Sequence, residues 1–410
     1  MIAYLPFSER RSDFPSLQRI YRGKPLTYFD GPAGTQMPRQ VIEAITSYYT
    51  TCNSNTHGCF VTTRESDTLL QETRRIIAMF LGAKHLNCIS LGANMTTLNF
   101  SLSKAIGRAM KPGDEVVITQ LDHEANRGPW LTLEERGVVV CEVALKQDGT
   151  LDYDDMRAKI GPRTRLLALG LASNALGTVN NVALARELTS KVGAWLLVDA
   201  VHYAPHFSID VQAMDVDFLL CSAYKFYGPH VGILYCREGL LNQLEPDRLR
   251  TQDQIAPYKI ETGTLNHAAI VGVKAAIEYV AALASGSDLR SKVVSAMRLI
   301  GQHERRLASA FYDGLLSIDG ITVYGQPFSS ALRAPTVSFT MRSNTAEEVC
   351  TRLAERGFCT WDGHFYALRA IEVLGLLERG GVTRVGISMY NTMEEVSNLL
   401  EEVRRIAEER

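Results

Sequence analysis

Two residues in this 410-residue sequence combine a reactive side chain with a place at the end of an apolar segment. Lys225 follows the apolar run 216–220, and Asp199 closes the apolar run 195–198. A lysine in a partly dry site loses its proton more easily, and the neutral amine attacks carbonyl groups. A carboxylate at the end of a buried strand is unfavourable unless a cation pairs with it. The pair therefore suggests imine chemistry on a ligand with a protonated ring nitrogen, although each residue alone is more often a surface lysine or a helix cap.

A turn further upstream is a candidate phosphate site. A short apolar strand at 87–91 is followed by Gly92-Ala93-Asn94 and then by a helix. This order brings backbone N–H groups and a helix N-terminus to one point, which suits an anion. The sequence contains neither G-x-G-x-x-G nor G-x-x-x-x-G-K-S/T, so a dinucleotide or a triphosphate is not indicated. One small phosphate fits this turn better, and the Ser222 hydroxyl could assist.

The surrounding chain predicts the elements that must position these groups. Strands are expected at 87–91, 115–119, 138–142, 165–171, 195–198, 217–221 and 231–236, with helices between most of them, including one from about 66 to 81 and one through Arg136. Such alternation predicts an α/β fold with a parallel sheet covered on both faces. The polar residues that follow the predicted strands are His123, Asn174, Asp199 and Ser222. Open α/β sheets bind their ligands at that edge.

Composition narrows the class of protein. Apolar residues make up 46% and charged residues 21%, as is typical of a globular chain with a large core. The net charge of −2 argues against a general nucleic-acid or membrane-surface binder, and no apolar stretch is long enough to span a membrane. The first residues lack the order of a secretory signal peptide, and the eight cysteines are scattered without a C-x-x-C pair. We therefore expect a cytoplasmic protein with reduced thiols and no metal site.

Together, the candidate groups describe a pyridoxal phosphate site. The lysine would hold the cofactor as an imine, the carboxylate would pair with the ring nitrogen, and the turn would bind the phosphate. His123 could stack on the ring, and Asn174 could bond the ring hydroxyl. The joint order of these residues along an alternating chain is more specific than any one of them.

The motifs around these residues resemble those of class V aminotransferases, which are fold-type I pyridoxal phosphate enzymes, and within them the SufS-type cysteine desulfurase and selenocysteine lyase group. The matching stretches are Tyr28-Phe29-Asp30, Asp122-His123-Glu124-Ala125-Asn126, Ser173-Asn174-Ala175-Leu176-Gly177-Thr178, Asp199-Ala200-Val201-His202, Ser222-Ala223-Tyr224-Lys225, Glu261-Thr262-Gly263-Thr264, and Arg384 with Ser388-Met389-Tyr390-Asn391. The resemblance implies a large cofactor-binding domain at 31–289 with a seven-stranded, mostly parallel sheet. It also implies a smaller α+β C-terminal domain at 290–410, to which an N-terminal arm at 1–30 would belong.

The resemblance also implies roles for individual residues. Lys225, Asp199 and His123 would be catalytic: the lysine links to the cofactor and moves protons, the aspartate pairs with the ring nitrogen, and the histidine stacks on the ring. Further cofactor contacts would come from His202, Asn174, Ala93, Asn94, Ser222, Tyr224 and Thr264. Thr264 would reach the phosphate of the neighbouring subunit, which implies a homodimer with shared active sites. The substrate would contact Arg384, a bidentate clamp for its α-carboxylate, and also Ala33, Asn55, His57, His364 and Tyr366.

One loop departs from the desulfurase pattern. Where that group carries R-T-G-H-H-C, this chain has Trp361-Asp362-Gly363-His364-Phe365-Tyr366, so a tyrosine stands at the position of the cysteine that takes up sulfur. Cys359 or Cys59 could be a displaced nucleophile, but a buried small hydrophobic residue is the commoner role for Cys359. We therefore expect an amino-acid substrate and a C–S lyase or β-elimination reaction at Cα/Cβ through an external aldimine.

Three alternatives stay open on the same scaffold. One is an aminotransferase or epimerase of class V, and another is a true cysteine desulfurase with a displaced cysteine. The third is a non-catalytic pyridoxal phosphate-binding scaffold that partners a sulfur carrier. The presence of Lys225, Asp199 and Arg384 together argues against the third.

Overall fold

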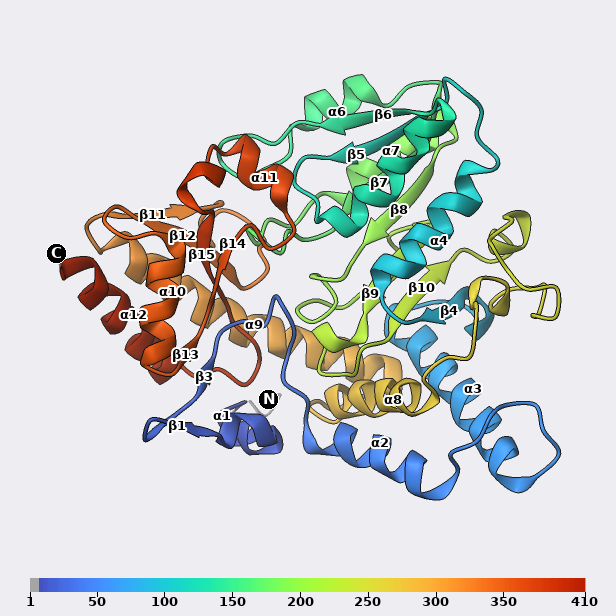
Figure 1. Cartoon of the computed structure of the whole chain (residues 1–410), viewed down its shortest axis with the longest axis horizontal. Coiled ribbons are helices and arrows are strands. Elements are labelled where there is room, and N and C mark those ends of the chain that lie inside the picture. Colours follow the sequence, from blue (N-terminus) through green and yellow to red (C-terminus); the bar gives the residue numbers. More distant parts are fainter. Residues whose placement is uncertain (1–6, 410) are drawn as a thin grey trace.

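The larger of two main sheets has seven strands and organises the first two thirds of the chain (Figure 1). The computed structural model describes residues 7–409. The strands are β4 (Ile89–Gly92), β5 (Glu115–Thr119), β6 (Val139–Val143), β7 (Thr164–Gly170), β8 (Trp195–Asp199), β9 (Phe218–Ser222) and β10 (Gly232–Cys236), in the spatial order β4-β10-β9-β8-β7-β5-β6. Strand β10 runs antiparallel to both of its neighbours, and the other pairs are parallel. The predicted seven-stranded, mostly parallel sheet is confirmed.

Helices cover both faces of this sheet because its strands are apolar on both sides. Successive side chains of a strand point to opposite faces, and in β9 Leu219 belongs to one core cluster while Leu220 belongs to the other. The first cluster includes residues of α3 (Val61–Leu81), α7 (Val182–Val192) and α8 (His267–Ala281). The second cluster includes residues of α4 (Met95–Gly107) and α5 (Gly128–Leu131). This two-sided burial leaves the ends of the strands as the places where polar side chains can gather.

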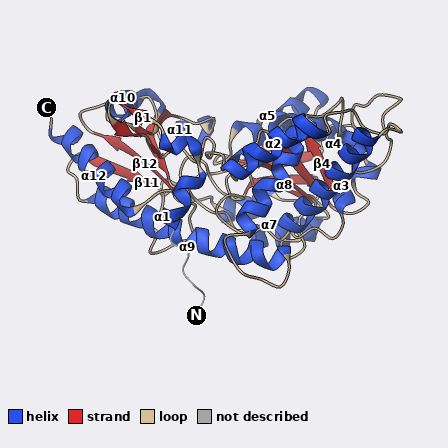
Figure 2. Ribbon diagram, turned by 90° about the horizontal axis from the view of Figure 1, so that it is seen from below, coloured by secondary structure: helices blue, strands red, loops and turns tan. Residues whose placement is uncertain are grey.

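The second sheet is smaller and antiparallel. Its strands are β11 (Ile321–Tyr324), β12 (Thr336–Met341), β15 (Val382–Gly386) and β14 (Trp361–Gly363), in that spatial order. A separate core packs it against α9 (Leu289–Leu316), α10 (Ala346–Glu355) and α12 (Met393–Glu408). Figure 2 shows the strands of the two sheets in separate halves of the molecule, each flanked by helices.

The N-terminal segment packs against the half that contains the smaller sheet, but not exclusively. Strand β3 (Thr27–Tyr28) pairs in parallel with β13 (Phe358–Cys359), and Phe29 lies in the core of that half. Phe14, however, lies in the core of the larger half. Helix α9 also contributes to both cores, so the domain boundary near residue 290 stays a prediction.

The remaining elements are short or peripheral. They are α1 (Phe7–Arg10), β1 (Ile20–Tyr21), β2 (Lys24–Pro25), α2 (Arg39–Thr51), α6 (Tyr153–Lys159) and α11 (Leu368–Val373). None of the helices within residues 7–409 is both long and apolar enough to cross a membrane.

Two helix predictions were inaccurate. Helix α3 begins at Val61, five residues before the expected start near Ser66. The helix expected through Arg136 is broken into α5 and a 3₁₀ turn, Thr132–Arg136. Pro129 lacks an N–H donor and so is tolerated only in the first turn of a helix, which makes Gly128 the start of a new helix.

Candidate functional site

A cavity of about 640 Å³ lies where β5, β7, β8 and β9 end. Eight of the residues predicted from sequence line it together: Asn94, His123, Asn174, Asp199, His202, Ser222, Tyr224 and Lys225. The strands that carry them are neighbours in the sheet, so residues more than one hundred positions apart in the sequence converge. The fold therefore builds the cavity at the edge where parallel sheets bind ligands.

Lys225 is the last residue of a 3₁₀ turn that directly follows β9. Its side chain is buried, and Nζ donates hydrogen bonds to the carbonyl oxygens of Pro32 and, at 3.1 Å, of Ala33. Burial, and next the positive charge of Arg384, lower the pKa of Lys225 to about 7. A large share of this amine is therefore neutral near pH 7, the form that attacks a carbonyl.

Asp199 ends β8 and faces the same cavity. Its Oδ1 accepts a hydrogen bond from the backbone N–H of Val201 at 2.9 Å, and burial raises its pKa to about 6. Within residues 7–409, nothing donates a hydrogen bond to Oδ2. A protonated ring nitrogen would satisfy that oxygen, so Asp199 fits the pyridine end of pyridoxal phosphate.

His202 is a second cavity residue with an unsatisfied atom. Its Nε2 lies 2.9 Å from Thr336 Oγ1, while Nδ1 is buried without a hydrogen-bond partner in the described part of the chain. Burial holds the pKa of His202 well below its usual value, so the ring is neutral. A buried polar atom of this kind favours a ligand with a complementary group.

The predicted phosphate turn is tied to the end of β9. Asn94 caps α4 by accepting from the Thr97 N–H at 2.9 Å, and the Met95 N–H donates to Ser222 Oγ at 3.0 Å. A Cβ at Gly232 would lie 2.3 Å from the carbonyl carbon of Asn94, so only glycine lets the turn lie directly on β10. Thr96, which the sequence did not single out, also lines the cavity at this helix N-terminus. Such a turn suits a phosphate group.

His123 and Tyr366 meet at the edge of the cavity. Their ring centres lie 5.6 Å apart, and the Tyr366 side chain is 69% exposed. Burial, followed by the charges of Lys225 and Arg384, lowers the pKa of His123 to about 4, so its ring is neutral at pH 7. His364 lies on the same loop, where its Nδ1 accepts from the Tyr366 N–H at 3.2 Å.

Arg384, the predicted carboxylate clamp, already has a carboxylate partner. Its Nη2 lies 2.8 Å from Asp30 Oδ1, and its Nη1 donates to the Asn174 carbonyl at 3.2 Å. The guanidinium lies 4.0 Å from the centre of the Phe365 ring. Its Nε is buried without a partner in residues 7–409. Sequence reasoning missed Asp30, although it belongs to one of the quoted motifs.

Ala33, one of the predicted substrate contacts, lies in a turn beside Lys225. The N–H groups of Ala33 and Gly34 both donate to the Asp30 carbonyl, which closes a tight turn. The turn therefore presents carbonyl oxygens, not N–H groups, to Lys225.

Asp122 is a further cavity residue without a predicted role. Its Oδ1 accepts from the Gly170 N–H at 2.7 Å, and its Oδ2 accepts from Asn126 at 3.3 Å. Burial raises its pKa to about 7. Its position directly before His123 was the only signal in the sequence. Since both oxygens are bonded, Asp122 holds the backbone around the cavity.

Four predicted residues lie elsewhere. Asn55, His57 and Thr264 line a separate, more open cavity of about 1,380 Å³, and Ala93 lines a third cavity together with Thr264. All eight cysteines lie within the described residues, and none of them lines the Lys225 cavity. Burial, and next Asp30, raise the pKa of Cys359, which makes it a poor nucleophile.

Comparison with known proteins identifies the family of this chain. The model of the aminotransferase class-V family matches residues 27–399. A cysteine desulfurase of Salmonella gallinarum is 32% identical, with 98% of each chain covered. The solved cysteine desulfurase CsdA of Escherichia coli is 27% identical over 98% of both chains, with a TM-score of 0.85. A cysteine desulfurase of Thermococcus onnurineus NA1 is 26% identical, covering 99% of this chain and 98% of that one, with a TM-score of 0.88. The chain thus belongs to the class V aminotransferase family and is an enzyme that depends on pyridoxal 5′-phosphate.

Proposed function

We propose that the protein is a lyase that cleaves the C–S bond of an amino acid by β-elimination and does not pass the sulfur to one of its own thiols. The observation that carries this proposal is a cavity that contains a buried lysine and a carboxylate with only one of its oxygens bonded by the protein, but is lined by no cysteine of the described chain. The exposed side chain at the corresponding loop position is Tyr366, which cannot accept sulfur. The similarity to cysteine desulfurases supports the choice of a sulfur-containing substrate.

Each cavity residue has a proposed task. When bound, the cofactor supplies an electron sink for the pair left at the substrate Cα. Lys225 Nζ holds the cofactor and later takes up the proton from Cα, and Asp199 Oδ2 keeps a proton on the ring nitrogen. His123 stacks on the ring, while His202 and Asn174 bond its polar edge. The phosphate is held by Asn94, Ser222 and Tyr224 from this cavity, and by Ala93, which lines the neighbouring cavity but precedes Asn94 in the same turn.

Substrate binding falls to Arg384. Its buried Nε is free to receive an α-carboxylate, whereas Nη2 stays with Asp30. Elimination then breaks the Cα–H bond, with the proton going to Lys225, and the Cβ–S bond, whose electron pair leaves with sulfur. Hydrolysis of the remaining fragment releases pyruvate and ammonia.

L-cysteine should yield sulfide and pyruvate in equal amounts, with little alanine. The reason is that sulfur leaves as sulfide and no nearby thiol receives it. Product analysis of the purified enzyme measures this ratio, and Cys359→Ser and Cys59→Ser should leave it unchanged.

Other product patterns would overturn the proposal. Alanine as the main product, with loss of sulfide release in Cys359→Ser, would identify a desulfurase with a displaced thiol. Conversion of the cofactor to its amine form would identify an aminotransferase. Racemisation of the substrate without sulfide would identify an epimerase, and a cofactor spectrum that no amino acid perturbs would identify a scaffold.

The rate at which the cofactor-free protein takes up pyridoxal phosphate should depend on pH through Lys225. Below its pKa of about 7 the ammonium has no lone pair, so the rate should fall about tenfold for each further pH unit. Above that pKa the rate should level off. Stopped-flow absorbance measures it, and a rate that keeps rising through pH 9 would mean that the lysine keeps its ordinary pKa.

We also propose that two chains form a homodimer. Asn55, His57 and Thr264 line a cavity of their own, and Thr264 would complete the phosphate site of a second chain placed there. The same segments expose four large apolar side chains: Phe60, Val61, Leu249 and Ile255. Covering such side chains is the usual driving force of a dimer interface.

Sedimentation of the cofactor-loaded protein should therefore give the mass of two chains. The double variant Val61→Glu with Leu249→Glu should shift the protein toward monomer and weaken cofactor retention, because it removes Thr264 of the second chain from the site. Leu316→Glu, an exposed apolar side chain on α9, is a matched control that should leave the dimer intact. A wild-type monomer that retains the cofactor would contradict the proposal.

A further inference from the structure

The loop that carries Tyr366 has a strained backbone. Phe365 and Tyr366 adopt φ angles of 54° and 57°, in the left-handed region that non-glycine residues rarely occupy. A strained conformation of this kind persists only where the surrounding structure holds it in place. The groups that hold this loop therefore determine whether it stays against His123.

Two of these groups are hydrogen-bond donors in loops that follow strands of the large sheet. Asn174 Nδ2 donates to the Phe365 carbonyl at 2.8 Å, and the Glu124 N–H donates to the Tyr366 carbonyl at 2.7 Å. Both donors come from segments that line or adjoin the Lys225 cavity. The loop is thus fastened to the cavity edge by its own backbone.

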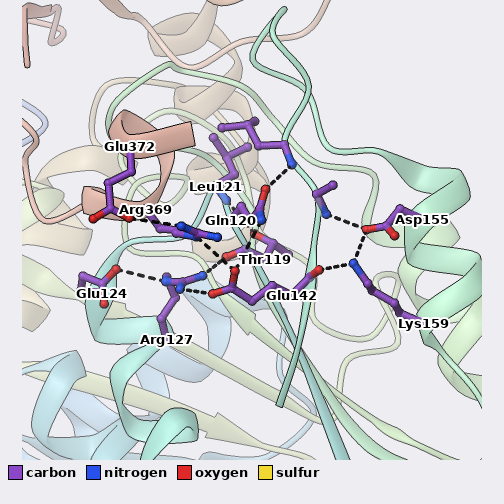
Figure 3. A network of polar contacts seen from close by, with 12 residues as sticks. Thr119, Gln120, Leu121, Glu124, Arg127, Glu142, Asp155, Lys159, Arg369 and Glu372 are labelled. Carbon is purple, nitrogen blue, oxygen red and sulfur yellow. Dashed lines mark hydrogen bonds and ion pairs between the residues drawn. The ribbon is translucent and has the colours of Figure 1, made fainter. Parts of the chain in front are cut away.

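The third group that holds the loop is a network of charged side chains, shown in Figure 3. Glu142 on β6 lies between two arginines: its Oε1 pairs with Arg127 Nη2, and its Oε2 lies 3.1 Å from Arg369 Nε. Arg127 also bonds Glu124 through Nε, at 3.1 Å, and the Thr119 carbonyl at 2.6 Å. Arg369 belongs to α11, which begins two residues after Tyr366.

The charged groups of this ion-pair network depend on one another. The Arg127 side chain is only 5% exposed, so its charge needs carboxylate partners. Burial alone would raise the pKa of Glu142, but Arg127 and then Arg369 outweigh it and keep the carboxylate ionised. One carboxylate thereby joins two guanidinium groups that would otherwise repel each other.

We propose that Glu142 and Arg369 are positioning residues, whose ion pair anchors α11 and holds the strained loop 364–366 closed over His123 at the entrance to the Lys225 cavity. The network runs from Arg369 on α11 through Glu142 and Arg127 to Glu124. Glu124 is the residue next to His123, so the loop side and the His123 side of the entrance are held by one network. The inference rests on the same site as the proposed function but not on the reaction carried out there.

Arg369→Met tests the inference. Arg369 is half-exposed, so its removal leaves no buried, unpaired polar group on α11. Methionine keeps the apolar part of the side chain. Hydrogen exchange of the amides in 364–373 should become about two- to fivefold faster, the range of a partly exposed ion pair. The rate at which borohydride bleaches the cofactor band should rise with it, because solvent reaches the cavity more often.

Two further variants separate positioning from general stability. Arg369→Lys should restore both rates in part, since it keeps the charge but not the fork of donors. Lys159→Met removes the Lys159–Asp155 ion pair and the hydrogen bond from Lys159 to the Glu142 carbonyl, at the other end of the same network. It leaves the Glu142 carboxylate with both arginines, so it should change neither rate.

The outcomes are separable from those of the proposed function. Unchanged exchange in Arg369→Met, or equal acceleration in Lys159→Met, would overturn the inference and mean that packing alone holds the loop. Neither readout requires turnover, so a different reaction would leave the result intact, whereas a protein without a cofactor band would contradict the site itself.

Discussion

Lys225→Ala should abolish the absorbance band of the bound cofactor in the visible or near-ultraviolet and lower turnover about a thousandfold or more. Lys225 is the lysine that lines the cavity, with its Nζ buried against the carbonyl oxygens of Pro32 and Ala33. Alanine provides no amine to hold the cofactor or to receive the α-proton. The variant should still fold, because the truncation removes a buried charge and leaves no new one.

Absorbance spectra and single-turnover rates check this prediction. Lys274→Met is the control: Lys274 pairs with Glu72 on the outside of the large sheet's helices, so its loss should leave the band unchanged. Mapping the peptide labelled by borohydride reduction should identify Lys225. A Lys225→Ala protein that keeps the band would contradict both the cofactor site and the proposed reaction.

Asp199→Asn should lower turnover about 10²–10³-fold while leaving the fold intact. The amide has the size of the carboxylate but no charge, so it cannot stabilise a proton on the ring nitrogen, and a buried charge that loses its partner is strongly destabilised. The side-chain oxygen of the variant would still accept the Val201 hydrogen bond that Asp199 Oδ1 accepts now. The cofactor band should shift as the ring nitrogen loses its proton.

Asp122→Asn is the matched control for this change. Asp122 lines the same cavity and is equally buried, but protein N–H groups already occupy both of its oxygens. Its replacement should affect stability more than the cofactor spectrum. If Asp122→Asn shifted the band and Asp199→Asn did not, the ring nitrogen would be assigned to the wrong carboxylate.

The sequence by itself determined the architecture of the larger sheet and most of the cavity. Strands that are buried on both faces appear in the sequence as continuous apolar runs. Each run ends where the chain leaves the core, so the sequence alone predicts the ends of β8 and β9. Asp199 and Lys225 stand at those ends, and parallel pairing of neighbouring strands brings them to one edge. The local sequence was therefore sufficient to predict the positions of Asp199 and Lys225.

Contacts between distant segments were decided only by the tertiary structure. The pairing of Arg384 with Asp30 joins residues 354 positions apart, and no periodicity encodes it. The separation of Asn55, His57 and Thr264 from the Lys225 cavity likewise depends on how whole helices pack. The same holds for the bridge from Arg127 through Glu142 to Arg369. In the sequence each partner resembles an ordinary surface charge. It acquires a specific role only because folding buries it, and a buried charge is stable only when an opposite charge pairs with it.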